Sequence, residues 1–344
     1  MKTVTVNTSK SYEIKIGSGL LNTIGQEAVS LGKATKVCIV SDSNVFPLYG
    51  QCVADSLMQA GLEVSSFVFQ AGEHMKNGDT FLSLLNTLAE MQLTRTDLIV
   101  ALGGGVVGDL AGFSAACYLR GIRFIQVPTT LLAAVDSSVG GKTAIDLPAG
   151  KNLAGAFWQP SLVLCDTDTL SSLPVEIFAD GCAEVIKYAV LYDPELFALL
   201  EKDGLCFDRE TIIARCIDWK RRAVELDEFD TGERMKLNLG HTIGHAIEKC
   251  SNFSISHGQA VAIGMAIAAR GTDCIDTKRI ERLLTQFALP IHCSYHAEDL
   301  LQKARSDKKR SADTINLIIP KMIGHCEIVS STFDELRSIL EAGI

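Results

Sequence analysis

The sequence predicts two domains: an α/β domain with a mostly parallel sheet over residues 1–172, and an all-α domain over residues 173–344. The first half alternates short β-branched runs with helical patterns, which is typical of parallel sheets. After Leu173 and Pro174 the strand signals nearly vanish and helical periodicity follows. A chain of 344 residues with 47% hydrophobic content can fill a core of this size.

The expected strands of the first domain are short apolar runs. They are VTVN, YEIKI, KVCIVSD, EVSSFVFQ, DLIVALGGG, RFIQVPTT and SLVLCDTD. The expected helices of the second domain are AEVIKYAVL, ETIIARCIDWKRRAVEL, HTIGHAIEKC and GQAVAIGMAIAARG. One strand-like segment, NLIIPKMIGHCEIV, returns late, and the sequence does not assign it to a sheet.

Composition argues against several classes of partner. The formal net charge of -9 disfavours binding to nucleic acid or anionic membranes, which normally requires a basic surface. No apolar run approaches the roughly 18 residues that span a bilayer, and MKTVTVNTSK lacks the apolar core of a signal peptide, so we expect a cytoplasmic protein. The 11 cysteines are odd in number and never spaced CxxC, which indicates reduced thiols.

A glycine-rich turn follows the run Leu98–Leu102. The sequence GGGVVGD at 103–109 then leads into a helical pattern, and glycines before a helix N-terminus let a phosphate approach the backbone. The turn fits the Rossmann-like pattern GxGxxG, although a tight structural turn would also explain it. No acidic residue ends a strand about 20 residues later, as it does in the usual fingerprint. Asp42, just after the run KVCIV, could bind a ribose instead.

Three of the seven histidines lie close together in the sequence, at His241, His245 and His257. The first two are four residues apart, hence on one helical face, and His257 begins a later helix that can fold back beside them. Glu184, in an otherwise apolar run, could complete a three-ligand metal site with an open position. A single histidine in an apolar helix is more often a core residue, and spacing alone does not decide which two histidines bind metal.

Several basic residues lie in apolar or glycine-rich segments of the sequence. Lys142, Lys151 and Asn152 share one glycine-rich segment, and Lys187 follows Glu184 by one helical turn. Lys220 and Arg234 flank the histidine segment, and we expect such a set to bind phosphate and carboxylate groups. The alternative is that each is a surface lysine or arginine whose stem covers apolar surface.

The ordered motifs resemble the 3-dehydroquinate synthase family, one of the sugar-phosphate cyclases. The resemblance spans most of residues 70–325 and rests on GGGVVGDLAGFSAACYLRG, FIQVPTTLLAAVDSSVGGKTAIDLPAGKNLAGAFWQP, DTDTLSSLP, AEVIKY, RMKLNLGHTIGHAIE, HGQAVAIG and SDKKR. It implies a dehydroquinate synthase-like fold, with an active site in the cleft between the α/β and helical domains. It also implies a homodimer, because the arginine at the position of Arg120 reaches the neighbouring subunit's site in that family.

The resemblance also implies roles for individual residues. Glu184, His241 and His257 would bind the metal, usually zinc with cobalt as an alternative, and His245, Asp230 and Lys142 would be catalytic. The implied NAD contacts are Asp42, Asn44, Glu73, Lys76, Gly104, Gly105, Val106, Asp109, Thr129, Thr130, Lys151, Thr169 and Ser172. The implied substrate contacts are Arg120, Asp136, Lys142, Asn152, Lys187, Lys220, Arg234, Asn238, and Lys308 or Lys309.

The activity that the resemblance implies is the conversion of 3-deoxy-D-arabino-heptulosonate 7-phosphate to 3-dehydroquinate and phosphate in the shikimate pathway. NAD would be recycled within the reaction, and the substrate is a small phosphorylated keto acid. Three departures from the family pattern are Asp230 in place of a glutamate, Ala189 in place of a glycine, and AGEHMKN in place of a DGE segment.

Three rival interpretations remain at the level of sequence. A metal-dependent alcohol or glycerol dehydrogenase would not need Lys142, Lys151, Lys220 and Arg234 around one substrate. A catalytically silent NAD-binding protein predicts a damaged metal triad, whereas this triad is intact. Cyclases that act on hexose phosphates share the triad, and the proposed carboxylate-binding pair Lys220 and Arg234 disfavours them.

Overall fold

The computed structural model describes residues 1–307 and 314–344. These residues form two compact units, Met1–Leu173 with Arg209–Phe229, and Pro174–Asp208 with Asp230–Ile344. The sequence-based domains met between residues 172 and 173 and placed 209–229 in the second domain. This segment instead belongs to the first unit, because its helix α7 (Arg209–Leu226) packs against strands of that unit. Helical periodicity shows that one face of α7 is buried, but not which domain covers that face.

The first unit is built on a seven-stranded sheet with the order β1-β2-β9-β6-β5-β3-β4. Only β1 is antiparallel to its neighbour, so the mostly parallel sheet predicted from sequence is confirmed. The strands are β1 (Lys2–Val6), β2 (Tyr12–Gly17), β3 (Lys36–Asp42), β4 (Glu63–Phe69), β5 (Leu98–Gly103), β6 (Arg123–Pro128) and β9 (Leu162–Asp166).

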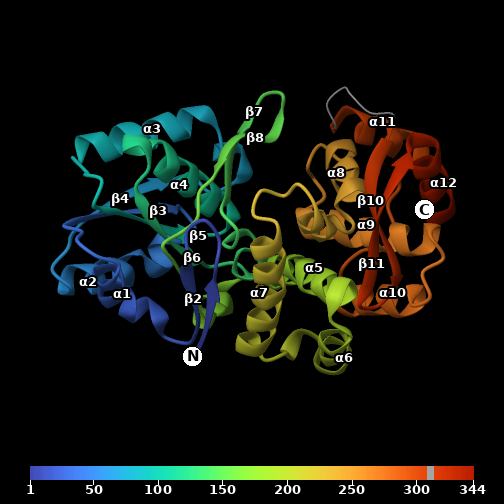
Figure 1. Cartoon of the computed structure of the whole chain (residues 1–344), viewed down its shortest axis with the longest axis horizontal. Helices are drawn as coiled ribbons and strands as arrows, with labels where there is room; N and C mark the ends of the chain where they lie inside the picture. The colour runs from blue at the N-terminus through green and yellow to red at the C-terminus, as the bar shows by residue number, and fades with distance from the viewer. Residues whose placement is uncertain (308–313) are drawn as a thin grey trace. The chain divides into compact units, whose positions relative to one another are not determined.

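Helices cover both faces of this sheet (Figure 1). On one face α1 (Ile24–Ser30) and α2 (Gln51–Gln59) enclose a core that includes Leu57. On the other face α3 (Gly78–Glu90) and α4 (Gly105–Cys117) enclose a second core. The chain crosses from β3 to β4 and from β5 to β6 in opposite directions along the sheet. The carboxyl ends of β3 and β5 therefore form a topological switch point, where open α/β sheets bind ligands.

A second sheet of the first unit is a hairpin, β7 (Lys142–Leu147) and β8 (Gly150–Phe157), which the sequence analysis did not predict. It packs on α4, where a Cβ at Gly112 would lie only 2.4 Å from the Cγ2 atom of Thr143. Glycine is therefore required for the close approach of helix and hairpin. The hairpin carries three of the basic or amide residues expected to bind ligands.

The second unit is mainly helical and contains one antiparallel hairpin. Its strands, β10 (Thr314–Met322) and β11 (His325–Thr332), hold the late strand-like segment, so that segment forms a sheet of its own. The helices are α5 (Val175–Tyr192), α6 (Pro194–Asp203), α8 (His241–Cys250), α9 (His257–Gly271), α10 (Thr277–Gln286), α11 (Ala297–Asp307) and α12 (Phe333–Gly343).

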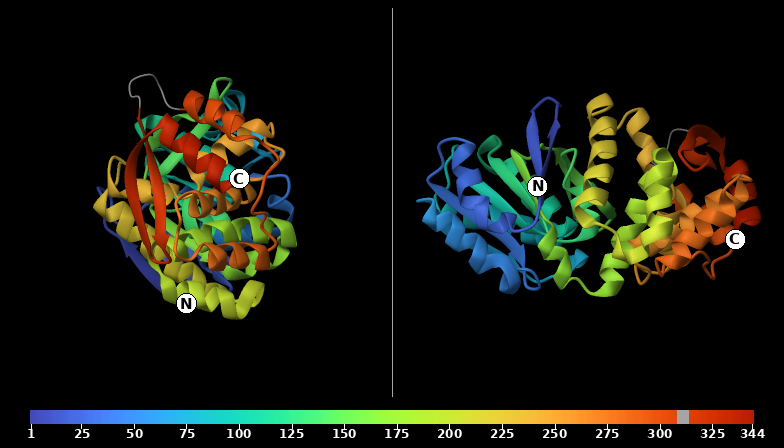
Figure 2. Two further views of the ribbon diagram at one scale, coloured as in Figure 1. Left: turned by 90° about the vertical axis from the view of Figure 1, so that its right-hand side faces the viewer. Right: turned by 90° about the horizontal axis from the view of Figure 1, so that it is seen from below.

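The hairpin of the second unit lies beside helices of the same unit (Figure 2). β10 contacts α9, and residues such as Leu317 join Ile247, Ile267 and Leu340 in one core. Short 3-10 or π-helical turns complete the two units: η1 (Leu20–Thr23), η2 (Phe46–Gly50), η3 (Glu73–Met75), η4 (Tyr118–Arg120), η5 (Ala133–Ser137), η6 (Thr167–Ser172), η7 (Gly204–Cys206) and η8 (Glu233–Asn238).

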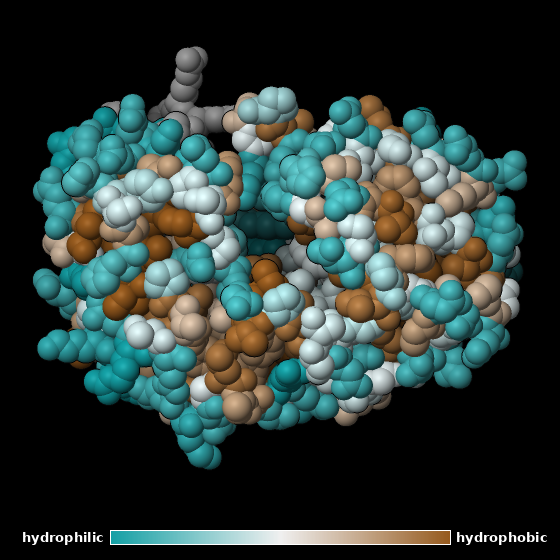
Figure 3. Space-filling view, turned by 180° about the vertical axis from the view of Figure 1, so that it is seen from behind, coloured by the Kyte–Doolittle hydropathy of each residue, from teal (hydrophilic) through white to brown (hydrophobic). Residues whose placement is uncertain are grey.

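The exposed surface is mixed in character. Figure 3 shows a face that hydrophilic side chains largely cover, with hydrophobic side chains in separate patches. Among the described residues, no helix has both the length and the apolar character that a membrane span needs.

Candidate active site

Three side chains from three helices of the second unit form a compact cluster. Glu184 comes from α5, His241 begins α8 and His257 begins α9. Glu184 Oε1 lies 3.4 Å from Nε2 of His241 and 3.3 Å from Nε2 of His257. One potential ligand atom from each residue lies within 4.8 Å of the others. The structure thus brings together the three residues that the resemblance names as metal ligands.

The carboxylate of Glu184 fits a site for a cation. It is fully buried and neither oxygen accepts a hydrogen bond, although Oε2 is in direct contact with the ammonium group of Lys187. Buried carboxylate oxygens without hydrogen bonds are costly unless a cation compensates them. One carboxylate and two imidazoles form a donor set that suits divalent ions such as Zn2+ or Co2+. The residues therefore fit a divalent metal.

Both histidines of the cluster present the same ring nitrogen to Glu184. Nδ1 of His241 lies 3.0 Å from the carbonyl oxygen of Leu239, which can only accept a hydrogen bond. Nδ1 of His257 lies 3.6 Å from Oε1 of Glu248. A proton held on Nδ1 leaves the lone pair of Nε2 available, which is the form that binds a metal.

Backbone packing fixes the helices that carry the cluster. A Cβ at Gly264 of α9 would lie 2.1 Å from the carbonyl oxygen of Gly240, so glycine lets α8 and α9 approach closely. Asp180 of α5 accepts hydrogen bonds from Ser256 Oγ and from the backbone N–H of Gln259, at 3.0 Å. Because Asp180 precedes Glu184 by one helical turn, this cap holds the start of α9 beside α5.

Charge interactions within the cluster shift two pKa values. Burial opposes ionisation of Glu184, but Lys187 and the histidines outweigh it and hold its pKa well below the usual range. Burial also lowers the pKa of His257, but its close contacts with the carboxylates of Glu184 and Glu248 outweigh burial and raise the pKa to about 10. The cluster therefore favours the carboxylate form of Glu184 and the protonated form of His257, whose Nε2 proton a bound metal would replace.

The third histidine, His245, lies beside the cluster without joining the Glu184 contacts. Its ring centroid is 5.5 Å from that of His241 and 6.1 Å from that of His257. Its side chain is 41% exposed, against 12% for His241. This position and exposure suit an acid/base group that meets a substrate.

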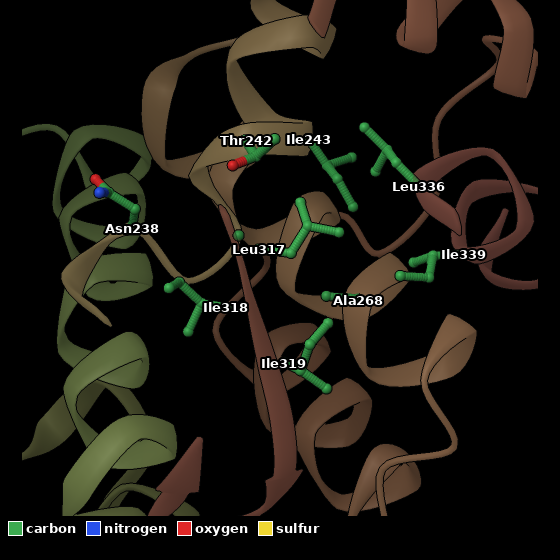
Figure 4. A pocket seen from close by; sticks show the side chains of 10 residues that line it. Asn238, Thr242, Ile243, Ala268, Leu317, Ile318, Ile319, Leu336 and Ile339 are labelled. Carbon is green, nitrogen blue, oxygen red and sulfur yellow. The ribbon is translucent and has the colours of Figure 1, made fainter. Parts of the chain in front are cut away.

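Two hollows lie in the second unit near these residues. One, of about 190 Å³, is lined by Met235, Asn238, His241, Thr242, His245, Ala304, Ile315, Asn316 and Ile318. The other, drawn in Figure 4, is lined mainly by aliphatic side chains and holds only about 20 Å³. The smaller space is about the size of one water molecule, so it is a packing defect of the core. The larger one adjoins His245 and His241 and can receive part of a substrate.

Nearly all the predicted NAD contacts follow the carboxyl ends of parallel strands. Asp42 and Asn44 follow β3, Glu73 and Lys76 follow β4, Gly104, Gly105, Val106 and Asp109 follow β5, Thr129 and Thr130 follow β6, and Thr169 and Ser172 follow β9. Lys151, on β8, is the exception. Because carboxyl ends of parallel strands meet at one edge, the structure gathers these residues along the edge where such sheets bind nucleotides.

The buried ammonium group of Lys76 connects several of the predicted ligand-binding residues. Its Nζ lies 2.9 Å from Glu73 Oε1, 3.2 Å from Asp109 Oδ2 and 2.8 Å from Asn152 Oδ1. Asp146 of β7 accepts a hydrogen bond of 2.8 Å from the backbone N–H of Asn152, whose φ is +56°. Burial raises the pKa of Asp109 to about 6, and Lys76 partly offsets that rise. A predicted substrate contact thus lies directly against predicted NAD contacts.

Two of the lysines predicted to contact substrate are buried. This burial contradicts the alternative that they are surface residues. Lys187 is 1% exposed, and Lys220 is 7% exposed with its Nζ 2.7 Å from Asp136 Oδ1. Arg234, at the start of η8, is 1% exposed. Buried cations of this kind are paired or bind ligands. Asp136, itself a predicted substrate contact, therefore compensates the buried charge of Lys220.

The other predicted residues are more exposed. Lys142, Asn238 and Arg120 lie on the surface of their units, and Arg120 ends η4 in a left-handed conformation with φ of +65°. Asp230 also has a positive φ, of +58°, and is half-buried. Lys308 and Lys309 lie outside the described residues.

Sequence reasoning missed Glu248, Asp146 and Asp180. Glu248 and Asp146 contact residues with predicted roles, while Asp180 holds the helix start that carries His257. One signal for Glu248 was present, because it lies two helical turns after His241 and thus on the same face. Nothing in the sequence indicated the contacts of Asp146 and Asp180, which depend on a hairpin turn and a helix cap formed across different segments.

Family models match most of the chain. The model described as 3-dehydroquinate synthase N-terminal matches residues 66–180, and that described as 3-dehydroquinate synthase C-terminal matches residues 181–310. A 3-dehydroquinate synthase of Pelobacter propionicus is 46% identical over 358 residues, covering 98% of this chain and 99% of the relative.

Two solved structures extend the likeness to the fold. A 2-deoxy-scyllo-inosose synthase complexed with carbaglucose-6-phosphate, NAD+ and Co2+ has a TM-score of 0.90 at 26% identity, covering 100% of both chains. A 2-epi-5-epi-valiolone synthase from Streptomyces hygroscopicus subsp. jinggangensis, with NAD+ and Zn2+ bound, has a TM-score of 0.86 at 24% identity, covering 98% of both chains. The latter likeness shows the fold alone.

Proposed function

The chain belongs to the 3-dehydroquinate synthase family, and from that membership we propose that it converts 3-deoxy-D-arabino-heptulosonate 7-phosphate to 3-dehydroquinate and phosphate. The observation that carries the proposal is the cluster of Glu184, His241 and His257, whose buried carboxylate lacks hydrogen bonds. The reaction belongs to the shikimate pathway, and the enzyme is a phosphate-eliminating carbon-oxygen lyase.

The cofactors in this proposal are NAD and a divalent metal, with zinc as the expected ion and cobalt as an alternative. Bound NAD would supply a reversible hydride acceptor and the metal a Lewis acid for a substrate oxygen. Glu184, His241 and His257 would hold the metal, and the loops at the carboxyl ends of β3 to β6 and β9 would hold NAD. Neighbours that contain NAD+ with Co2+ or Zn2+ support this assignment.

His245 is the acid/base group in this proposal. Its imidazole lines the 190 Å³ hollow and is the most exposed of the three clustered histidines, so its Nε2 can exchange a proton with a substrate oxygen. Asp230 would assist proton transfer with a shorter side chain than the usual glutamate.

The substrate's two anionic groups would be bound by different cations. Lys220 and Arg234 would bind the carboxylate, since charge-assisted hydrogen bonds from buried cations contribute about 1.5 to 3 kcal/mol each. Lys142 and Asn152 would bind the phosphate, joined by Lys308 or Lys309 and by Arg120 of a second subunit in a homodimer. Asp136, Lys187 and Asn238 would make the remaining substrate contacts.

Both units, Met1–Leu173 with Arg209–Phe229 and Pro174–Asp208 with Asp230–Ile344, would contribute residues that bind the substrate. The NAD loops and the phosphate-binding hairpin belong to the first, whereas the metal cluster and His245 belong to the second. The family resemblance, which implies one active site that draws on both domains, supports the proposal that one substrate molecule contacts both sets of residues. Orientation of one molecule by both sets of residues would supply much of the rate enhancement.

Phosphate release tests the proposal. The purified chain, incubated with the keto-acid sugar phosphate, catalytic NAD and Zn2+, is expected to release one phosphate per substrate without net NADH. Accumulation of NADH in proportion to product would instead support an alcohol or glycerol dehydrogenase. Turnover of a hexose phosphate, with none of the keto acid, would support another sugar-phosphate cyclase.

Assembly and location are tested separately. We expect a homodimer in the cytoplasm, and light scattering after size-exclusion chromatography would measure twice the chain mass. A monomer with full activity would contradict the role of Arg120 in a neighbouring site.

A further inference from the structure

Glu248 is a buried carboxylate near the end of α8 for which the proposed reaction has no use. It is 5% exposed and lies two helical turns after His241, on the same face of the helix. Its Oε1 is 3.6 Å from Nδ1 of His257, and its Oε2 is 4.0 Å from Nε2 of His245. Burying a carboxylate is costly, so a position beside these two imidazoles suggests a function.

The two ring nitrogens of His257 face different carboxylates. Nε2 faces Glu184 at 3.3 Å, and Nδ1 faces Glu248. A neutral imidazole carries one proton, and a carboxylate at Nδ1 keeps the proton there. The lone pair of Nε2 is then directed toward Glu184, where a metal would lie.

His241 has the same arrangement with a different acceptor. Its Nδ1 faces the carbonyl oxygen of Leu239 at 3.0 Å, and its Nε2 faces Glu184 at 3.4 Å. The backbone thus orients one histidine. His257 lies in the first turn of α9, and the group that its Nδ1 faces at 3.6 Å is the Glu248 carboxylate of α8.

We propose that Glu248 is a positioning residue that holds the Nδ1–H tautomer and ring orientation of His257 for metal binding. The proposal rests on the proposed metal site and adds to it a carboxylate outside the ligand set. Carboxylates in this position also raise the basicity of the histidine ligand, and their loss typically weakens metal binding by about 10- to 100-fold.

The test is metal binding by the full-length chain after its metal is removed. Co2+ is titrated against a chelator of known affinity, and the visible absorption of bound Co2+ reports the ligand geometry. Glu248→Ala is expected to weaken Co2+ binding by about 10- to 100-fold and to alter the spectrum. Glu248→Gln retains an oxygen that accepts from Nδ1–H, so its loss is expected to be smaller.

Two further variants serve as controls for this result. Glu281→Gln removes a half-buried carboxylate that pairs with Arg270 of α9 at 2.7 Å, and it should leave Co2+ affinity and spectrum unchanged. Glu184→Ala should abolish binding, which tests the metal site itself. If the unaltered chain bound no metal, the proposed function would fail, whatever Glu248 does.

Two outcomes would overturn the positioning role. Wild-type affinity and spectrum in folded Glu248→Ala, or in Glu248→Gln if the alanine variant does not fold, would show that the carboxylate does not act on His257. Complete loss of binding in Glu248→Gln, equal to that in Glu184→Ala, would make Glu248 a ligand together with His245 and His257, whose atoms also lie within 4.8 Å of one another.

Discussion

Two regions of the molecule bury charge but compensate it differently. One is the candidate metal site of the second unit, formed by Glu184, His241 and His257, and the other is the network around Lys76 in the first unit. Around Lys76 the ammonium group has carboxylate and amide oxygens of the chain within 3.2 Å. Around Glu184 the ammonium group of Lys187 contacts Oε2, whereas Oε1 faces the Nε2 atoms of His241 and His257, and neither oxygen accepts a hydrogen bond. A charge that hydrogen bonds of the chain satisfy acts as scaffold, whereas a carboxylate oxygen that faces two imidazole nitrogens without a hydrogen bond indicates a metal ligand.

The largest effect is expected at Glu184. Glu184→Ala removes one of three ligands, so bound metal and all turnover should be lost while the fold persists. Metal content per chain and phosphate release measure this result. Retention of one metal per chain in the variant would show that Glu184 is not a ligand. The difference drawn between the Glu184 and Lys76 regions would then fail.

Lys76 should behave as a scaffold residue with an effect on stability. Lys76→Met leaves the half-buried Asp109 and the partly exposed Glu73 without their cation, which is expected to cost about 1 to 3 kcal/mol. Urea unfolding measures the loss, and NAD binding should weaken as well. Metal content should stay at the wild-type level, and loss of metal in this variant would erase the distinction between the two regions.

Lys220 has features of both a scaffold residue and a ligand-binding residue. It is paired with Asp136 and yet is expected to bind the substrate carboxylate. Lys220→Ala should weaken substrate binding by about 10- to 100-fold, as one charge-assisted hydrogen bond is lost, with little change in NAD affinity. Isothermal titration with each ligand measures the two affinities. Equal losses for substrate and NAD would reject the carboxylate role.

Asp97 offers a purely structural comparison in the first unit. It is fully buried and accepts hydrogen bonds from backbone N–H groups of Thr35, Lys36 and Thr94. Burial alone would raise its pKa, but these bonds outweigh burial and lower the pKa to about 2. Because the folded pKa is depressed, the stabilisation is present above the unfolded pKa of about 3.9 and is lost as pH falls toward 2.

Asp97→Asn replaces one carboxylate oxygen with an NH2 group. That group would face a backbone N–H, so two donors would meet and one hydrogen bond would be lost. The variant is expected to lose about 2 kcal/mol at pH 7 and much of the pH dependence between about 4 and 2, with metal and NAD binding unchanged. Denaturant unfolding at several pH values measures both effects. An unaltered pH profile would show that Asp97 does not carry this dependence.

Much of the fold could be predicted because each buried strand is a continuous apolar run between turn signals. The β7–β8 hairpin was missed because its half-exposed strands contain Gly150, Gly155 and few β-branched residues. The partner of α7 was missed because amphipathic periodicity does not say which surface covers the apolar face.

The candidate site was predictable in its residue types and less so in its geometry. Histidine spacing alone left open which two of the three histidines bind metal, and the family motifs were needed to favour His241 and His257 over His245. The structure places His257 Nε2 and His241 Nε2 at similar distances from Glu184. Glu248 required knowledge of which ring nitrogen faces which neighbour, and a sequence does not carry that information.

The most direct measurement is anomalous X-ray scattering at the zinc edge from crystals of the zinc-loaded chain. The account predicts a peak within about 2.0 to 2.2 Å of a Glu184 oxygen and of Nε2 of His241 and His257. A peak coordinated by His245 and Glu248 instead, or none near Glu184, would contradict it.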